Sequence, residues 1–308
     1  MNDSMLVAIL AAAISSGTPI LYAALGELIC ERSGVLNLGV EGMMLVGAVS
    51  GFLAAVRTGN LALGVLAALV AGGAMALIHA FMTISLKVNQ VVSGLALTLF
   101  GTGVSGYLGK SVIGVPLSVT FRAVSIPVLS SIPVVGPILF RHDLLVYVSY
   151  VLIPLAWFWL YRTRQGLHLR AVGESPETAD ALGVNVFAIR YVYVVLGGML
   201  AGLGGAYLSM ASAPSWIENM TAGRGWIAVA LVIFAVWNPI RAMAGAYLFG
   251  GVDALGFRIQ TLGVTVSSFF LKMLPYIFTV LVLIVVTARA RGRRTGAPEA
   301  LGTPYERE

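Results

Sequence analysis

"RAVGESPETADALGVN" (170–185) is a polar stretch that stands between two long apolar runs of the chain. Ser175 can cap a helix and Pro176 suits the first helical position, while Gly183 is placed to end the helix. The pattern therefore predicts a helix of about two turns over 176–182, which is too short to be stable alone in water. A short polar helix between apolar runs needs a surface on which to dock.

The composition of the rest of the chain identifies the class of protein. Of 308 residues, 58% are hydrophobic and 10% are charged, whereas an ordinary globular domain has about 25% charged residues. Several apolar runs reach the roughly 20 residues that cross a lipid bilayer. We therefore predict an all-α polytopic membrane protein. Its net charge of +6 is not gathered on one basic face, so we expect no nucleic-acid partner.

The apolar runs predict about nine membrane-spanning helices within a transmembrane domain that covers residues 1–288. Their approximate bounds are 5–27, 35–56, 61–84, 91–109, 143–161, 190–211, 225–238, 241–257 and 268–288. The run 225–238 is too short to cross the bilayer without a tilt, and it is typical of a half-helix. Residues 289–308 follow as a tail.

The positions of Lys and Arg predict the orientation of these helices. If the tail lies in the cytoplasm, most of the 19 basic residues fall on the cytoplasmic side, as the positive-inside rule requires. The N-terminus is then outside, and 162–190 is a cytoplasmic loop. The loop 110–142 is external. Because that loop is apolar but interrupted by prolines, we expect it to pack across the outer mouth of the bundle.

Two kinds of pattern argue against chemistry within this chain. "GTGVSG" (101–106) fits a dinucleotide-binding fingerprint, but it lies inside an apolar run with no preceding strand, so it indicates close helix packing. The histidines 79, 142 and 168 have no partners at metal-ligand spacing. We therefore predict no catalytic residues, no metal site and no cofactor.

Acidic residues within the predicted spans are rare and informative, since a charge near the bilayer centre normally faces protein or water. Glu41 follows Asn37 by four residues, so we expect the two side chains to share one helix face. Asp253 lies in another span. Asn37, Glu41 and Asp253 fit either structural contacts between helices or a translocation path, and the sequence leaves both interpretations open.

The short polar helix offers two interpretations of its own. Ala179 and Leu182 are expected on one face, where they could insert into a groove of another protein, and Glu174, Glu177 and Asp180 would surround that contact. Alternatively, the helix rests on its own protein.

Several segments give the chain a family resemblance. It resembles the membrane permease subunits of ABC importers in the ribose and branched-chain amino acid group, and within it the nucleoside branch that is served by basic-membrane-protein-type lipoproteins. The segments that carry this resemblance are "ERSGVLNLGVEGMMLVGAV" (31–49), "GLHLRAVGESPETADALGVNV" (166–186), "GRGWIAVALVIFAVWNPIRAMAGAYLFGG" (223–251) and "SIPVLSSIPVVGPILF" (125–140).

The resemblance implies that the polar helix is a coupling helix, which fits a groove of an ATP-hydrolysing subunit. Carried onto this sequence, the contact falls on Glu174, Ser175, Pro176, Ala179, Leu182 and Gly183. The resemblance also implies an ABC ATPase, a second and non-identical permease subunit, and a periplasmic or lipid-anchored binding protein at a bacterial cytoplasmic (inner) membrane.

The function that follows is the translocation path of an ATP-driven importer, without enzymatic activity of its own. The resemblance favours a nucleoside or nucleobase as the solute, with a simple sugar as the alternative. An ion-coupled secondary transporter and a polytopic membrane enzyme are the rival classes. "ERSGVLNLGVEG" and "AGRGWIAVALV" both place a charge and glycine before a span, which suggests an inverted repeat around the fifth span.

Overall fold

The structure is a computed structural model that describes residues 3–261, 270, 273, 274, 276–281, 284 and 296–307. Most of the predicted ninth span, 268–288, therefore lies outside the described residues. Elsewhere the chain is mostly helical, as its composition predicts.

Long helices account for most of the described chain. They are α1 (Asp3–Glu31), α2 (Val40–Thr58), α3 (Leu61–Ala80), α4 (Gln90–Gly109), α6 (Leu144–Arg162), α9 (Val186–Tyr207) and α11 (Pro239–Thr261). Five-residue π-helical segments extend α3 and α9, namely η1 (Phe81–Ser85) and η4 (Leu208–Ser212). In the described part of the chain, six helices are long and apolar enough to cross a membrane, and they match the first six predicted runs.

The next two predicted runs appear as helices of different kinds. The run 225–238 overlaps α10 (Arg224–Phe234), which has 11 residues and is about 16 Å long at 1.5 Å per residue. The prediction of a short helix there is confirmed. The run 241–257 lies within α11, which carries both basic and acidic side chains.

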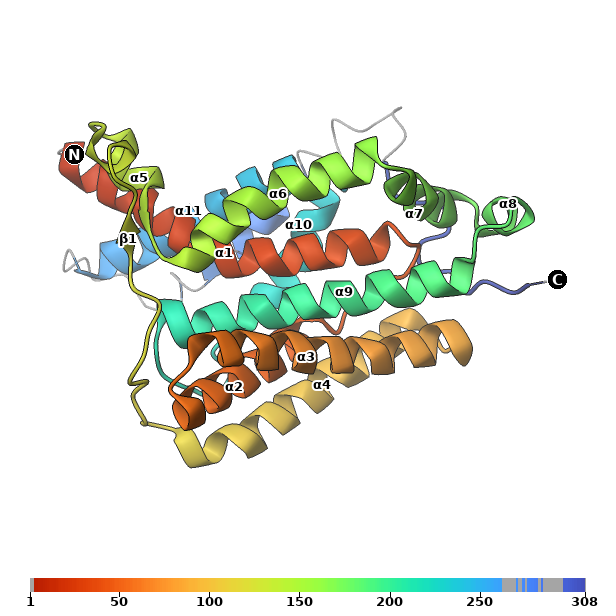
Figure 1. Cartoon of the computed structure of the whole chain (residues 1–308), viewed down its shortest axis with the longest axis horizontal. Helices are drawn as coiled ribbons and strands as arrows, with labels where there is room; N and C mark the ends of the chain where they lie inside the picture. Colours follow the sequence, from red (N-terminus) through yellow and green to blue (C-terminus); the bar gives the residue numbers. More distant parts are fainter. Residues whose placement is uncertain are drawn as a thin grey trace.

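Close packing of the long helices depends on glycine. In Figure 1, α1 and α9 run side by side through the bundle, with α2, α3 and α4 on one side and α11 on the other. A side chain at Gly198 would meet Gly72 and Ala76 of α3, and one at Gly202 would meet the Ala68 carbonyl. The Gly198–Gly202 spacing therefore lets α9 pack closely against α3.

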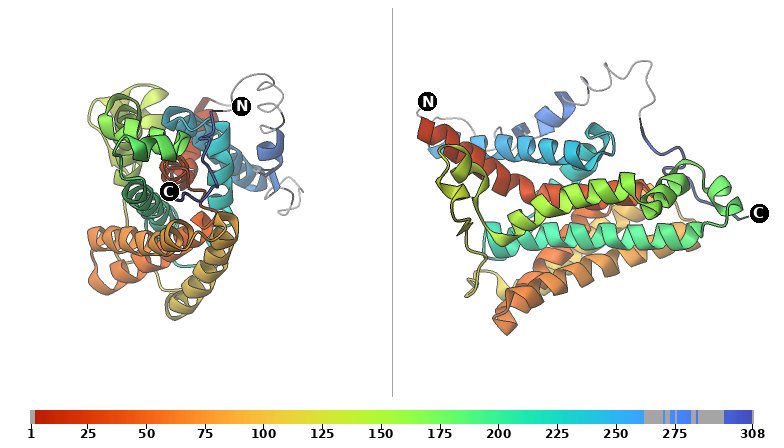
Figure 2. Two further views of the ribbon diagram at one scale, coloured as in Figure 1. Left: turned by 90° about the vertical axis from the view of Figure 1, so that its right-hand side faces the viewer. Right: turned by 45° about the horizontal axis from the view of Figure 1, so that its top comes forward.

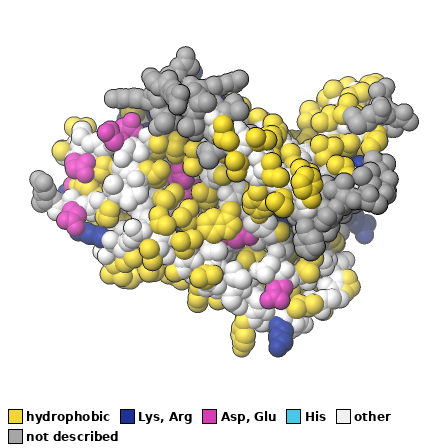
Figure 3. All heavy atoms as spheres, turned by 180° about the vertical axis from the view of Figure 1, so that it is seen from behind, with side chains coloured by type: hydrophobic (Ala, Val, Ile, Leu, Met, Phe, Trp, Pro, Cys, Tyr) yellow, Lys and Arg dark blue, Asp and Glu magenta, His cyan; other side chains and the backbone are white. Residues whose placement is uncertain are grey.

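The connections gather at the two ends of the bundle. The N-terminus and the loop 110–142 lie at one end, while α7 (Arg164–Glu174), α8 (Pro176–Ala181) and residues 296–307 lie at the other (Figures 1 and 2). Apolar side chains cover much of the face seen in Figure 3, and charged side chains gather mainly toward its ends. This distribution suits a bundle surrounded by lipid.

The loop 110–142 is ordered. It contains η2 (Lys110–Val112), η3 (Leu129–Ser131), α5 (Val135–Leu139) and the antiparallel pair of β1 (Val124–Ser125) with β2 (Arg141–His142). The amide of Phe121 donates to the Met210 carbonyl, and the amide of Leu117 donates to the Pro214 carbonyl. The loop therefore packs across the end of α9, and its location on the outer side stays a prediction.

Candidate functional sites

The first candidate site is a polar junction between the beginnings of α2 and α10. Gly39 precedes the first residue of α2, and Gly223 precedes α10 with a φ of 83°, a left-handed conformation that favours glycine. Each helix therefore begins at a glycine inside the bundle. The first amides of a helix have no partners within it, so each beginning needs a hydrogen-bond acceptor.

Glu41, in the first turn of α2, supplies that acceptor for α10. Its carboxylate accepts hydrogen bonds from the Thr221 hydroxyl at 2.6 Å, the Gly223 amide at 2.8 Å and the Gly225 amide at 2.6 Å. Glu41 is buried, and a side chain at Gly225 would collide with its backbone. A carboxylate at the N-terminal ends of two helices is also favoured by their dipoles. The acid therefore joins α2 to α10.

A second charged contact lies close to this junction. Arg224, the first residue of α10, forms an ion pair with Asp253 of α11 at 2.8 Å, and both side chains are partly buried. The same guanidinium also donates to the Thr221 carbonyl. Both predicted intramembrane acids are thus bonded within the protein, Glu41 to residues around the start of α10 and Asp253 to Arg224. Asp253 joins α10 to α11.

The prediction that Asn37 and Glu41 share one helix face is wrong. Asn37 precedes α2, and its side-chain oxygen accepts from the Gly39 amide at 2.9 Å. The backbone amide of Asn37 donates to the buried carboxylate of Glu27 at 2.9 Å. Because the helix begins at Val40 instead of residue 35, the four-residue spacing does not place the two side chains on one helix face. The structure brings Glu41 and Asp253 to neighbouring contacts and leaves Asn37 in the connection before α2.

The second candidate site is the short polar helix, which the structure places at 176–181. Pro176 stands at its first turn as predicted, but Ser175 makes no capping bond, because its hydroxyl pairs with Thr178 at 2.8 Å. Gly183 has a φ of 84° and its amide donates to the Asp180 carbonyl. Gly183 therefore ends the helix, as the sequence predicts.

The faces of α8 differ from the prediction. Ala179 is only 2% exposed and packs with Val172 of α7 and Val186 of α9, whereas Leu182 is 79% exposed. The two residues do not lie on one partner-facing surface. Ala179 lies inside the helix and faces the protein, whereas Leu182 follows the last helical residue and faces away from it. Pro176 is also buried, and Glu174 and Gly183 are exposed. The helix rests on its own protein through Ala179 and presents Leu182 and Glu177 outward, whereas Asp180 is bound by Tyr305 and Arg307 instead of facing a partner.

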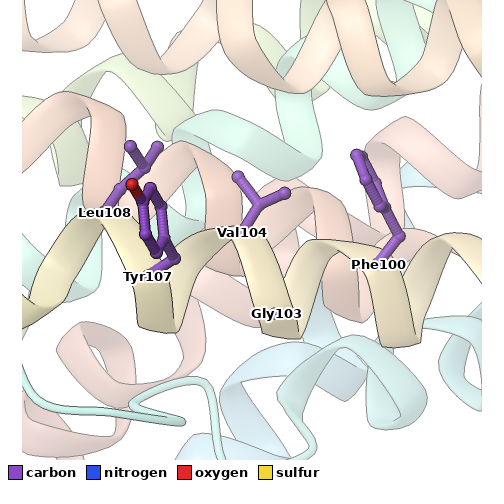
Figure 4. Close-up of a pocket in the computed structure, with 5 residues that line it drawn as sticks. All are labelled: Phe100, Gly103, Val104, Tyr107 and Leu108. Atoms are coloured by element: carbon purple, nitrogen blue, oxygen red, sulfur yellow. The ribbon is translucent and has the colours of Figure 1, made fainter.

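The glycine-rich stretch in α4 has a packing role at one position only. A side chain at Gly101 would meet the backbone of Gly42 in α2, so close packing there is confirmed. Gly103 instead faces open space and lines a shallow surface pocket with Phe100, Val104, Tyr107 and Leu108 (Figure 4). Apart from the Tyr107 hydroxyl, these side chains are apolar. The pocket therefore offers few groups to recognise a polar solute.

The histidines make structural contacts where they are buried. His79 pairs with the Ser93 hydroxyl at 2.9 Å and the Leu36 carbonyl at 3.0 Å. His142 pairs with Ser15 and with the Ile138 carbonyl. Across the described ranges, no three His, Cys, Asp or Glu side chains form a group that could hold a metal ion.

Comparison with known proteins then identifies the family. Residues 9–288 match the family model described as the branched-chain amino acid transport system permease component. The chain belongs to this family. It is thus the permease component of an ABC transporter and a multi-pass membrane protein, and permeases of this family work with an ATPase and a substrate-binding protein.

Relatives of the permease carry names for two solute classes. It is 44% identical to a putative glucose ABC transporter permease of Haloferax volcanii, over 99% of each chain. It is 35% identical to a nucleoside ABC transporter permease of Lactococcus lactis, over 94% of this chain and 93% of that protein. It is also 35% identical to a guanosine ABC transporter permease of Bacillus subtilis, over 96% of each. A solved putative metal-chelate type ABC transporter has a TM-score of 0.49 at 14% identity, covering 90% of this chain and 85% of that chain.

Proposed function

We propose that this permease forms the path by which a nucleoside or nucleobase enters the cell, driven by ATP hydrolysis in a separate subunit. Two relatives named for nucleoside and guanosine transport align along nearly the whole chain, and this observation carries the proposal. The proposed site of action is a bacterial cytoplasmic membrane, with the N-terminus outside and α8 in the cytoplasm. A binding protein would deliver the solute, and a second, non-identical permease would complete the path.

The proposed ATPase-docking surface is the exposed face of α8. Leu182 offers an apolar anchor, and Glu174 and Glu177 are exposed beside it. A small apolar anchor with polar groups around it is typical of the centre of a protein interface. Ser175 and Gly183 would fix the ends of this surface, while the buried Pro176 and Ala179 would hold the helix from behind.

The contacts of the intramembrane acids favour structural roles over ion coupling. Glu41 already accepts three hydrogen bonds, and Asp253 is paired with a guanidinium. An ion-coupling acid must exchange its partner for an ion during transport, whereas these carboxylates are occupied by the protein. We therefore assign Glu41 and Asp253 to the junction that holds α2, α10 and α11 together beside the path, and Asn37 to the connection that leads into it.

A simple sugar is the second candidate, because the relative at 44% identity is named as a putative glucose permease. The two solute classes can be separated by uptake into right-side-out membrane vesicles that contain the permease, its ATPase, its binding protein and ATP. We expect labelled guanosine to accumulate and unlabelled glucose to leave that accumulation unchanged. Vesicles whose ATPase cannot hydrolyse ATP are the control. Accumulation of glucose but not of nucleosides would overturn the assignment of the solute.

A further inference from the structure

The C-terminal segment 296–307, here called the strap, lies across the same end of the bundle as α8 (Figure 2). Its middle is fixed by backbone hydrogen bonds. The Ala300 amide donates to the Gly173 carbonyl at 3.0 Å, and the Gly302 amide donates to the Gly34 carbonyl at 3.3 Å. The strap therefore joins the end of α7 to the connection between α1 and α2.

A buried arginine strengthens this attachment. Arg190 of α9 is only 2% exposed, and its guanidinium donates to the Thr303 carbonyl at 3.3 Å. A buried guanidinium without an acceptor is costly, because the charge loses its hydration. The strap thus supplies an acceptor that the helices around Arg190 need. The buried Pro298 and Ala300 also show that this part of the strap is packed against the bundle.

The end of the strap contacts α8 directly. The Tyr305 hydroxyl donates to the Asp180 carboxylate at 2.9 Å, and Arg307 forms an ion pair with the same carboxylate at 2.9 Å. The Tyr305 ring is 6% exposed and lies 5.6 Å from the Phe187 ring, and it closes the cluster that buries Ala179. Both described partners of the Asp180 side chain therefore come from the strap.

A third connection leads to the segment between η1 and α4. Lys87 forms an ion pair with Glu306 at 2.8 Å. Its hydrogen bond and charge hold the pKa of the Glu306 carboxyl below its usual range. The pair is exposed, so its contribution to stability is small. The Lys87–Glu306 pair shows that the strap also contacts the connection before α4.

We propose that the strap holds α8 in its working position and transmits the movement of α8 to the connection that leads into α2. This inference rests on the proposed coupling role of α8. The helix has six residues and cannot keep its shape alone, so its packing on Val172, Val186 and Tyr305 fixes its position. Movement of α8 would pass through Asp180 and Tyr305 to the strap, and from Gly302 to Gly34.

Cysteine labelling tests the position of α8 without reference to transport. In a Cys30→Ser background, Ala179→Cys should react slowly with a maleimide, because position 179 is buried under Tyr305. Ending the chain after Thr303, or changing Tyr305→Ala, should raise the labelling rate at least tenfold. Tyr305→Phe keeps the ring and should raise it less than about threefold. Leu182→Cys is the exposed control, and in the permease purified without its ATPase it should react rapidly in every case. Equal rates with and without Tyr305 would overturn the proposal.

Coupling is then measured in proteoliposomes that contain the assembled transporter. With Tyr305→Ala or the shortened chain, we expect the ratio of solute imported to ATP hydrolysed to fall at least fivefold. Glu299→Gln, at an exposed position on the strap, is the matched control and should keep the ratio of the original protein. If the unmodified transporter imports no solute with ATP, the proposed function fails. If it does, and the variants keep its ratio, the strap proposal alone fails.

Discussion

Replacing Glu41 with Gln tests the junction between α2 and α10 most directly. One carboxylate oxygen accepts from Thr221 and Gly223, and the other accepts from Gly225. A Gln side chain can place its carbonyl oxygen at only one of these positions, so its NH2 group would face a backbone N–H. A hydrogen bond to a charged group is worth about 1.5–3 kcal/mol, and an unpaired buried donor costs about 1–3 kcal/mol. We expect Glu41→Gln to lower stability by about 2–4 kcal/mol.

The assay is thermal unfolding of the purified permease, followed by the loss of its monodisperse peak in size-exclusion chromatography. At roughly 2–4 °C per kcal/mol for a domain of 150–250 residues, the transition should fall by about 4–16 °C. Glu218→Gln is the matched control, because Glu218 is an exposed acid in the connection before α10, and it should leave the transition unchanged. A Glu41→Gln protein of full stability whose uptake loses a pH or sodium dependence would refute the structural role and favour ion coupling.

Four further predictions concern the described contacts and the orientation of the chain. Leu182→Asp should leave the bundle folded but weaken binding of the ATPase at least tenfold, as measured by co-purification, because a central anchor is worth 2 kcal/mol or more. Ala179→Arg should instead lower the stability of the permease itself, because position 179 is buried within it. Asp253→Asn should destabilise the permease by about 1–3 kcal/mol, since it removes a charged partner of Arg224. A cysteine at Ser4 should react with an impermeant reagent from outside intact cells, and labelling only after permeabilisation would reverse the predicted orientation.

The sequence predicts the helices better than it predicts their contacts. Runs of about 20 apolar residues are recognised locally, so the first six spans correspond to helices of the structure. The short run 225–238 is also recognised, since its length alone separates it from a full span. The mostly apolar residues 35–39 predict too early a beginning for α2, because Gly39 and the turn at Asn37 start the helix at Val40.

The partners of Glu41 could not be predicted because they lie about 180 residues away in the chain. Nothing in local periodicity connects α2 with residues 221–225. The glycines on both sides of Arg224 were the available signal, since they allow a helix to begin close to another backbone. In the tail, charged residues at 299 and 306–308 suggest exposure. Tyr305 and Pro298 among them were the signal that part of this segment is packed.

The position of these contacts suggests how the two candidate sites communicate. The strap binds α8 at Asp180 and the connection before α2 at Gly34, and that connection continues to Glu41, which holds the beginning of α10. Under the proposed role of the strap, a displacement of α8 would reach this junction between helices through hydrogen bonds and short loops. Separating the donor and acceptor of such a contact would leave buried polar groups without partners, which is costly. The contacting segments would therefore move together. The same reasoning predicts that loosening the strap and removing the Glu41 carboxylate act on one chain of contacts, so their effects on coupling should be less than additive.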